Sequence, residues 1–139
     1  MKVGIIKTEG YEDIESNIKK LLDITDFYSG KDIDWTKEIL IKPNFLASAP
    51  LESAVVTNPK VILGLVSVLK SRIKIIRVGE GSGEQSKGGT DAVFKSYNLH
   101  KLLEGKAELV NFDDDKVWVR INHEMIEYIA IAKECLNTQ

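Results

Sequence analysis

Side chains that could bind a ligand follow three apolar runs of this sequence. Lys42 and Asn44 come after one run, a glycine-rich stretch after another, and Asp113 after a third. A lysine ammonium can meet an anion, amide and hydroxyl groups can hydrogen-bond it, and glycines let backbone N–H groups approach it. We therefore predict a ligand-binding set of seven residues: Lys42, Asn44, Gly79, Glu80, Gly81, Ser82 and Gly83.

The glycine-rich stretch allows three interpretations. It could cradle a phosphate, but its glycine spacing matches neither the P-loop nor the dinucleotide fingerprint, and Glu80 and Glu84 would repel an anion unless a cation intervened. Glu80 and Asp113 could instead hold a hard cation through their carboxylate oxygens. The third interpretation is a permissive surface loop without a ligand.

Structural roles compete with each of the other candidates. Lys42 could reach solvent past the end of its strand, Asn44 could cap a turn, and the acidic run that begins at Asp113 could be a solvated turn. His100 and His123 have no partner at metal-ligand spacing. The sequence contains no pattern typical of a nucleophilic triad or a zinc site, so it predicts no particular reaction.

Composition narrows the class of protein. The 139 residues fit one globular domain, and a net charge of -2 argues against general electrostatic binding of nucleic acid or anionic membrane. No apolar run approaches the roughly 18 residues of a membrane span. The single cysteine, Cys135, excludes an internal disulfide and a cysteine-ligated iron–sulfur cluster on this chain alone. These features favour a cytoplasmic location.

Hydrophobic periodicity predicts strands that alternate with helices. Strands are expected at residues 2–7, 38–42, 73–78 and 108–112, and helices near 12–25, 59–71 and 90–103. The second helix has the clearest start, because Asn58 is a good N-cap and Pro59 suits the first turn. Residues 117–121 and 126–131 are expected to form an antiparallel pair that could extend the sheet.

This order predicts a three-layer, Rossmann-like α/β sandwich with about four parallel strands and a C-terminal antiparallel hairpin. In such sheets ligands bind beyond the C-terminal strand ends. The loops at residues 8–11, 43–57, 79–89 and 113–116 should gather at that edge. The whole chain, residues 1–139, is expected to form a single domain.

Several segments resemble, in the same order, the N-terminal part of the domain of unknown function 362 family. They are ILIKPNF from Ile39, VVTNPKVILGLVSVL from Val55, IIRVGEGSG from Ile75, DAVFKSYNLHKLL from Asp91 and ELVNFDDD from Glu108. The K-P-N and G-E-G-S-G segments are the most specific of them. The resemblance extends over most of the chain, to about Cys135.

The resemblance implies an enzyme-like family whose activity is unsettled and some of whose members are iron–sulfur proteins. Its members typically continue into a second half, so this chain is expected to be a half-length member and any shared catalytic centre to be incomplete. By the same resemblance, the stronger site candidates are Lys42, Asn44, Glu80, Ser82 and Gly83.

Two hypotheses for function follow. In the first, the chain is a ligand-binding domain in which Lys42 meets an anionic group and Glu80 or Asp113 holds a cation or acts as a base. In the second, it is a non-catalytic interaction subunit, or a fragment, that pairs with itself or with a partner chain supplying the missing half. An exposed apolar surface would favour the second hypothesis.

Overall fold

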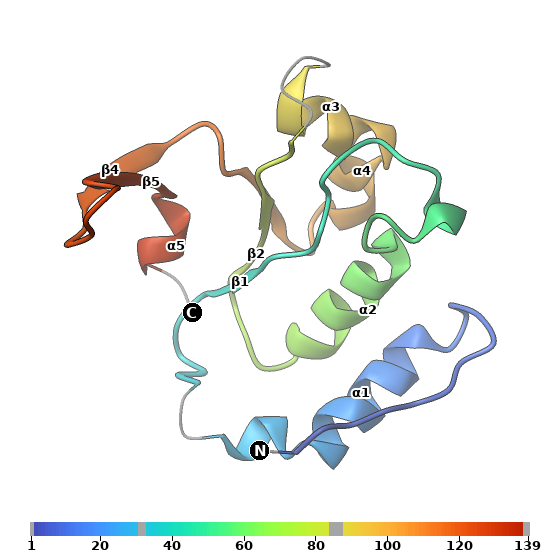
Figure 1. Cartoon of the computed structure of the whole chain (residues 1–139). Helices are drawn as coiled ribbons and strands as arrows, with labels where there is room; N and C mark the ends of the chain where they lie inside the picture. The colour runs from blue at the N-terminus through green and yellow to red at the C-terminus, as the bar shows by residue number, and fades with distance from the viewer. Residues whose placement is uncertain (1, 31–32, 84–87, 138–139) are drawn as a thin grey trace.

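Three short parallel strands form the centre of the computed structural model shown in Figure 1. They are ordered β1 (Ile39–Ile41), β2 (Ile76–Glu80) and β3 (Glu108–Asn111). The register pairs Ile41 with Val78 and Val78 with Leu109. The predicted mixed α/β class with a mainly parallel sheet is confirmed, although the parallel strands number three rather than four. The structure describes residues 2–30, 33–83 and 88–137.

Helices cover one face of this sheet, and residues 116–137 lie on its other side (Figure 1). A single core cluster joins side chains of β2 to those of α2, α3 and α4, and α1 packs against α2. The helices are α1 (Ile14–Ile24), η1 (Phe27–Ser29), η2 (Leu51–Ser53), α2 (Pro59–Leu69), α3 (Gly89–Ser96), α4 (Leu99–Leu103) and α5 (Glu134–Asn137). None of the helices in the described part of the chain is long and apolar enough to cross a membrane.

Helix α2 begins where the sequence predicts. The Asn58 side chain accepts a hydrogen bond from the Lys60 N–H, and Pro59 occupies the first turn. Replacement of Asn58 by alanine should lower the free energy of unfolding by about 1 kcal/mol, because that N–H loses its partner. Chemical denaturation measures the loss. Asn58→Asp is the matched control, since it keeps an acceptor and should retain most of the stability.

The predicted strand at residues 2–7 is wrong. This segment forms no strand and lies along α1, where a Cβ on Gly4 would come within 3.1 Å of Leu21 and 3.2 Å of Thr25. The Lys2 ammonium also pairs with the Asp26 carboxylate beyond the end of α1. Contacts with α1 therefore replace strand pairing, which accounts for the missing fourth strand.

The C-terminal antiparallel pair is confirmed but forms a sheet of its own. Strands β4 (Lys116–Arg120) and β5 (Tyr128–Ala132) pair only with each other in the described part of the chain. A turn at residues 112–115 separates β4 from β3, and the Asp114 N–H bonds back to the Asn111 carbonyl. The chain therefore leaves the parallel sheet here, and the hairpin projects to one side of it (Figure 1).

Candidate functional site

An ion pair joins the C-terminal ends of β1 and β2. The Lys42 Nζ lies 2.8 Å from Glu80 Oε2, and it also donates to the Pro43 carbonyl at 3.3 Å. The two partners differ in environment, because the Lys42 side chain is 58% exposed and that of Glu80 is 6% exposed. The ammonium is therefore held against a buried carboxylate while part of it faces solvent.

The Glu80 carboxylate is fixed by the backbone as well as by Lys42. Its Oε2 accepts from the N–H of Phe45 at 3.2 Å, and its Oε1 accepts from the N–H of Gly81 at 2.9 Å. A buried carboxylate requires such donors, because burial without partners is strongly unfavourable. Glu80 therefore ties the loop after β1 to the end of β2 and sets the position of the lysine.

A second polar cluster surrounds Thr90 at the start of α3. The Thr90 hydroxyl accepts a hydrogen bond from the Ser82 N–H at 2.7 Å. The same hydroxyl donates to Asp113 Oδ2 at 2.7 Å. The Lys116 Nζ lies 2.8 Å from Asp113 Oδ1. The structure thus connects the predicted residues Ser82 and Asp113 through Thr90, which is only 1% exposed. Thr90 and Lys116 were not among the residues predicted from the sequence; the sequence signal for Thr90 is a hydroxyl at a predicted helix start.

Asn44 holds the following loop together. Its Nδ2 donates to the Val55 carbonyl at 2.8 Å, and its N–H donates to the Thr57 hydroxyl at 2.9 Å. The Thr57 N–H returns a hydrogen bond to the Asn44 carbonyl at 2.8 Å. Asn44 is only two residues from Lys42 in the sequence, but its side-chain amide donates inside the loop.

Backbone donors of the glycine-rich stretch are also used within the protein. The Gly81 N–H bonds to Glu80, and those of Ser82 and Gly83 bond to the Thr90 hydroxyl and the Leu46 carbonyl. The Ser82 hydroxyl donates to the same Leu46 carbonyl at 2.8 Å. These bonds give no support to a phosphate cradle built from free N–H groups. Glu84 lies outside the described residues.

The space beside Gly79 is occupied by an aromatic ring. A Cβ at this position would lie 2.2 Å from Cε1 and 2.7 Å from Cζ of Phe112, which is itself 8% exposed. Glycine is therefore required here by packing within the protein. By contrast, a Cβ on Gly81 would meet Phe112 at an ordinary contact distance of 3.5 Å.

The described residues contain no group of three or more histidine, cysteine, aspartate or glutamate side chains that could hold a metal ion. Glu80 and Asp113 remain the pair suggested by the sequence. Each of these carboxylates already contacts a lysine ammonium, since Lys42 pairs with Glu80 and Lys116 with Asp113. A cation shared by Glu80 and Asp113 would have to displace both lysines.

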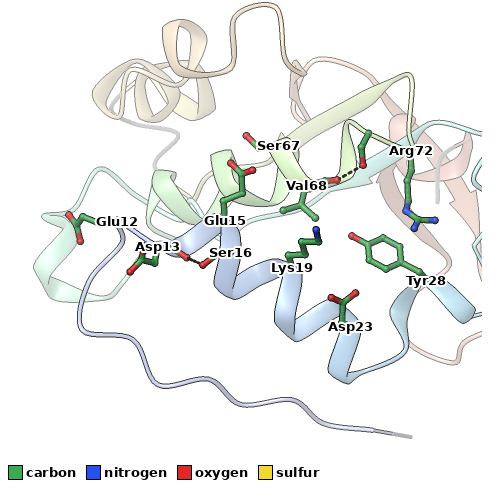
Figure 2. A pocket seen from close by; sticks show the side chains of 11 residues that line it. Glu12, Asp13, Glu15, Ser16, Lys19, Asp23, Tyr28, Ser67, Val68 and Arg72 are labelled. Atoms are coloured by element: carbon green, nitrogen blue, oxygen red, sulfur yellow. Dashed lines mark hydrogen bonds between the residues drawn. The ribbon is translucent and has the colours of Figure 1, made fainter.

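A separate groove of about 660 Å³ runs along α1, η1 and the C-terminal part of α2 (Figure 2). It contains none of the residues predicted for the site. The Arg72 guanidinium lies 4.3 Å from the centre of the Tyr28 ring. Burial raises the pKa of the Tyr28 phenol, and the positive charge of Arg72 partly opposes this shift. The sides of the groove also carry Glu12, Asp13, Glu15, Ser16, Lys19, Asp23, Ser67, Val68 and Ser71.

Together these features define an α/β domain whose parallel strands end at a polar edge. The loops that follow β1, β2 and β3 form this edge. The chain belongs to the family described as domain of unknown function DUF362, whose model matches residues 39–139. The match begins at β1, so the N-terminal segment and α1 lie outside it. Comparisons with curated proteins and with solved structures gave no match.

Proposed function

We propose that this DUF362 domain binds a small anionic ligand at the C-terminal edge of its parallel sheet, with Lys42 as the principal contact. One observation supports the proposal most directly: the Lys42 ammonium is 2.8 Å from buried Glu80 although its own side chain is 58% exposed. An ammonium has three N–H donors, and Glu80 and the Pro43 carbonyl accept from it. A further donor is therefore available for an anion from solvent.

The surroundings of Lys42 favour an anion that approaches from outside the loops. Glu80 holds the ammonium at the strand ends, which lowers the conformational entropy lost when a ligand binds. The other candidate contacts remain Asn44, Gly79, Gly81, Ser82 and Gly83; Gly79 lies in β2 and the others lie in the neighbouring loops. Glu80 acts in this proposal as a positioning residue, because its oxygens already accept from Lys42 and the backbone.

Titration with inorganic phosphate, followed by amide chemical shifts, tests the proposal. Wild-type protein should show saturable shifts around Lys42 and Gly81, and Lys42→Gln should weaken binding by about tenfold or more through loss of a charged donor. Lys60→Gln is the matched control. Lys60 is also 58% exposed and paired with a carboxylate, but its partner Glu12 is exposed and lies elsewhere. Equal phosphate affinity of wild type and Lys42→Gln would refute the proposal.

A cation-assisted version of the same site uses Glu80 and Asp113. Its support is that Thr90 and the glycine-rich stretch connect the two carboxylates at one edge. Repeating the phosphate titration with Mg²⁺ distinguishes the versions. A bridging cation should increase phosphate affinity and shift the Asp113 amide, and Asp113→Asn should remove that increase without changing the cation-independent binding.

A second candidate function is self-association through the C-terminal hairpin. Trp118 is 73% exposed and Met125 87% exposed, and Ile126 and Tyr128 are also exposed on the same hairpin. A two-stranded sheet is marginally stable in water by itself, so burial of this surface against a second copy would stabilise it. This surface is where an interaction subunit would pair.

Native mass spectrometry over a range of protein concentrations tests this candidate. Wild type should form a dimer as concentration rises, and Trp118→Ser should shift the dissociation constant upward by about tenfold or more, as expected for an exposed aromatic anchor. Ile24→Ser is the control, because Ile24 is 52% exposed on α1, away from the hairpin. A wild-type monomer at all concentrations would exclude self-association.

A further inference from the structure

The outer edge of β1 has unpaired backbone groups. In the described part of the chain, β1 pairs only with β2, and the Ile39 N–H bonds to the Ile75 carbonyl on that side. Because N–H and C=O groups alternate in direction along a strand, those of Leu40 point to the open edge. An edge of this kind is a template for another strand.

Residues 3–7 have the sequence of a strand but no strand partner. Val3 is 76% exposed and Ile5 is 88% exposed, and no backbone hydrogen bond connects the segment to another described residue. β-Branched residues such as these are enriched in strands, where their side chains pack well. Beside α1, Gly4 packs against Leu21 and Thr25, and the Lys2–Asp26 ion pair lies just before the segment.

The segment already runs in the direction of the sheet. Helices α1 and α2 lie side by side and run parallel, with Glu12 and Lys60 paired near their N-terminal ends (Figure 1). Residues 3–7 run back along α1, since Gly4 lies against Leu21 and Ile24 near the end of that helix. Because α2 runs opposite to β1, the segment and β1 point the same way.

We infer that the open edge of β1 accepts residues 3–7 of the same chain as a fourth parallel strand, in a second arrangement of the N-terminal segment. The resulting unit, segment–α1–β1, repeats the observed unit β1–α2–β2 on the same face and with the same hand. The short connection to α1 gives the tethered segment a far higher effective concentration than a second copy, which favours pairing within one chain.

The chain can make this movement without unfolding α1. Residues 8–13 span at most about 20 Å when extended, compared with a helix diameter of about 10 Å. Ile18 is the one buried residue among those described in α1, although Ile14, Leu21 and Leu22 are also apolar. The helix therefore has apolar surface that an adjacent strand would cover.

One register aligns the lysines that end the two segments, Lys7 and Lys42. It places Ile5 opposite Leu40, so that the Leu40 carbonyl would accept from the Ile6 N–H and the Leu40 N–H would donate to the Gly4 carbonyl. Lys7 would then add a second ammonium beside Lys42. This last consequence depends on the proposed anion site, whereas the strand pairing does not.

Amide hydrogen exchange measured by NMR on the full chain tests the pairing through the Leu40 N–H. Ile6→Pro removes the N–H that would face β1, whereas Ile5→Pro removes an N–H on the outer side, where an edge strand tolerates proline. We expect Leu40 to exchange at least about twofold more slowly in wild type and in Ile5→Pro than in Ile6→Pro, the slowing expected when the two arrangements are about equally populated. Protection of the central Val78 amide shows that each variant is folded.

Equal Leu40 exchange in all three proteins would overturn the inference. Leu40 protection that disappears on dilution, together with a dimer by light scattering, would also overturn it, because a second copy would then supply the strand. Because exchange is measured without phosphate, failure of the anion site leaves this result unaffected.

Discussion

Replacement of Glu80 by alanine should lower the free energy of unfolding by about 2–4 kcal/mol. The substitution leaves the Phe45 and Gly81 N–H groups without their acceptor, and Phe45 is fully buried. An unsatisfied buried donor such as the Phe45 N–H costs about 1–3 kcal/mol, and the part-buried Gly81 N–H adds a smaller amount. Urea denaturation monitored by circular dichroism measures the change, with the slope of the transition checking that unfolding remains two-state.

Two variants test whether the loss of stability in Glu80→Ala comes from removal of the buried carboxylate. Lys42→Gln removes the other half of the ion pair, but the Glu80 carboxylate keeps its two backbone donors, so this variant should be less destabilising than Glu80→Ala. Glu124→Ala, at an exposed glutamate, should change stability by less than about 0.5 kcal/mol. A Glu80→Ala transition that coincides with that of wild type would show that the carboxylate does not anchor the loops.

Lys42 is exposed and Glu80 is buried, so we expect Lys42 to bind the anion and Glu80 to support the fold. Loss of Lys42 should abolish most phosphate binding while leaving the fold intact, because the lysine is exposed and the Glu80 carboxylate keeps its backbone donors. Loss of Glu80 should weaken both properties, since it removes the support of the ammonium and of two loops. A protein that binds phosphate normally after loss of Glu80 would require another cation at the site.

The sequence predicted the parallel sheet because local signals and packing agree there. Asn58 and Pro59 start α2 through hydrogen-bonding and backbone preferences that are independent of the rest of the chain. Apolar runs predicted all three strands of the parallel sheet, and their common direction brought Lys42 and Glu80 together. Residue type and topology were sufficient for these features.

Other features depend on loop geometry and on which partner is available. A strand pattern at residues 2–7 gives no information on whether the chain will pair with β1 or lie along α1. The sequence likewise could not show that the Asn44 side chain would donate to the Val55 carbonyl, or that the Ser82 N–H would donate to the Thr90 hydroxyl. Gly79 was assigned to ligand approach, because the sequence does not reveal that Phe112 packs against it.

Gly79→Ala should lower the free energy of unfolding by about 1–3 kcal/mol, the usual effect of forcing extra volume into a packed site. The new Cβ would stand 2.2 Å from Phe112 Cε1, so the buried ring must move. Alanine also loses less conformational entropy than glycine on folding, but this gain of about 0.4–1 kcal/mol does not outweigh the clash. Gly81→Ala is the matched control, because its Cβ would be 3.5 Å from Phe112 and should change stability little.

A double-mutant cycle attributes the loss to the Phe112 ring. Phe112→Leu shortens the side chain and is destabilising by itself, yet it opens space for a methyl group at position 79. The double variant should therefore be more stable than the sum of the two single effects predicts, with a coupling of about 0.5–3 kcal/mol. Strict additivity would contradict the steric explanation, because two side chains that compete for the same space must interact. Such a result would return Gly79 to consideration as a position kept small for a ligand rather than for Phe112.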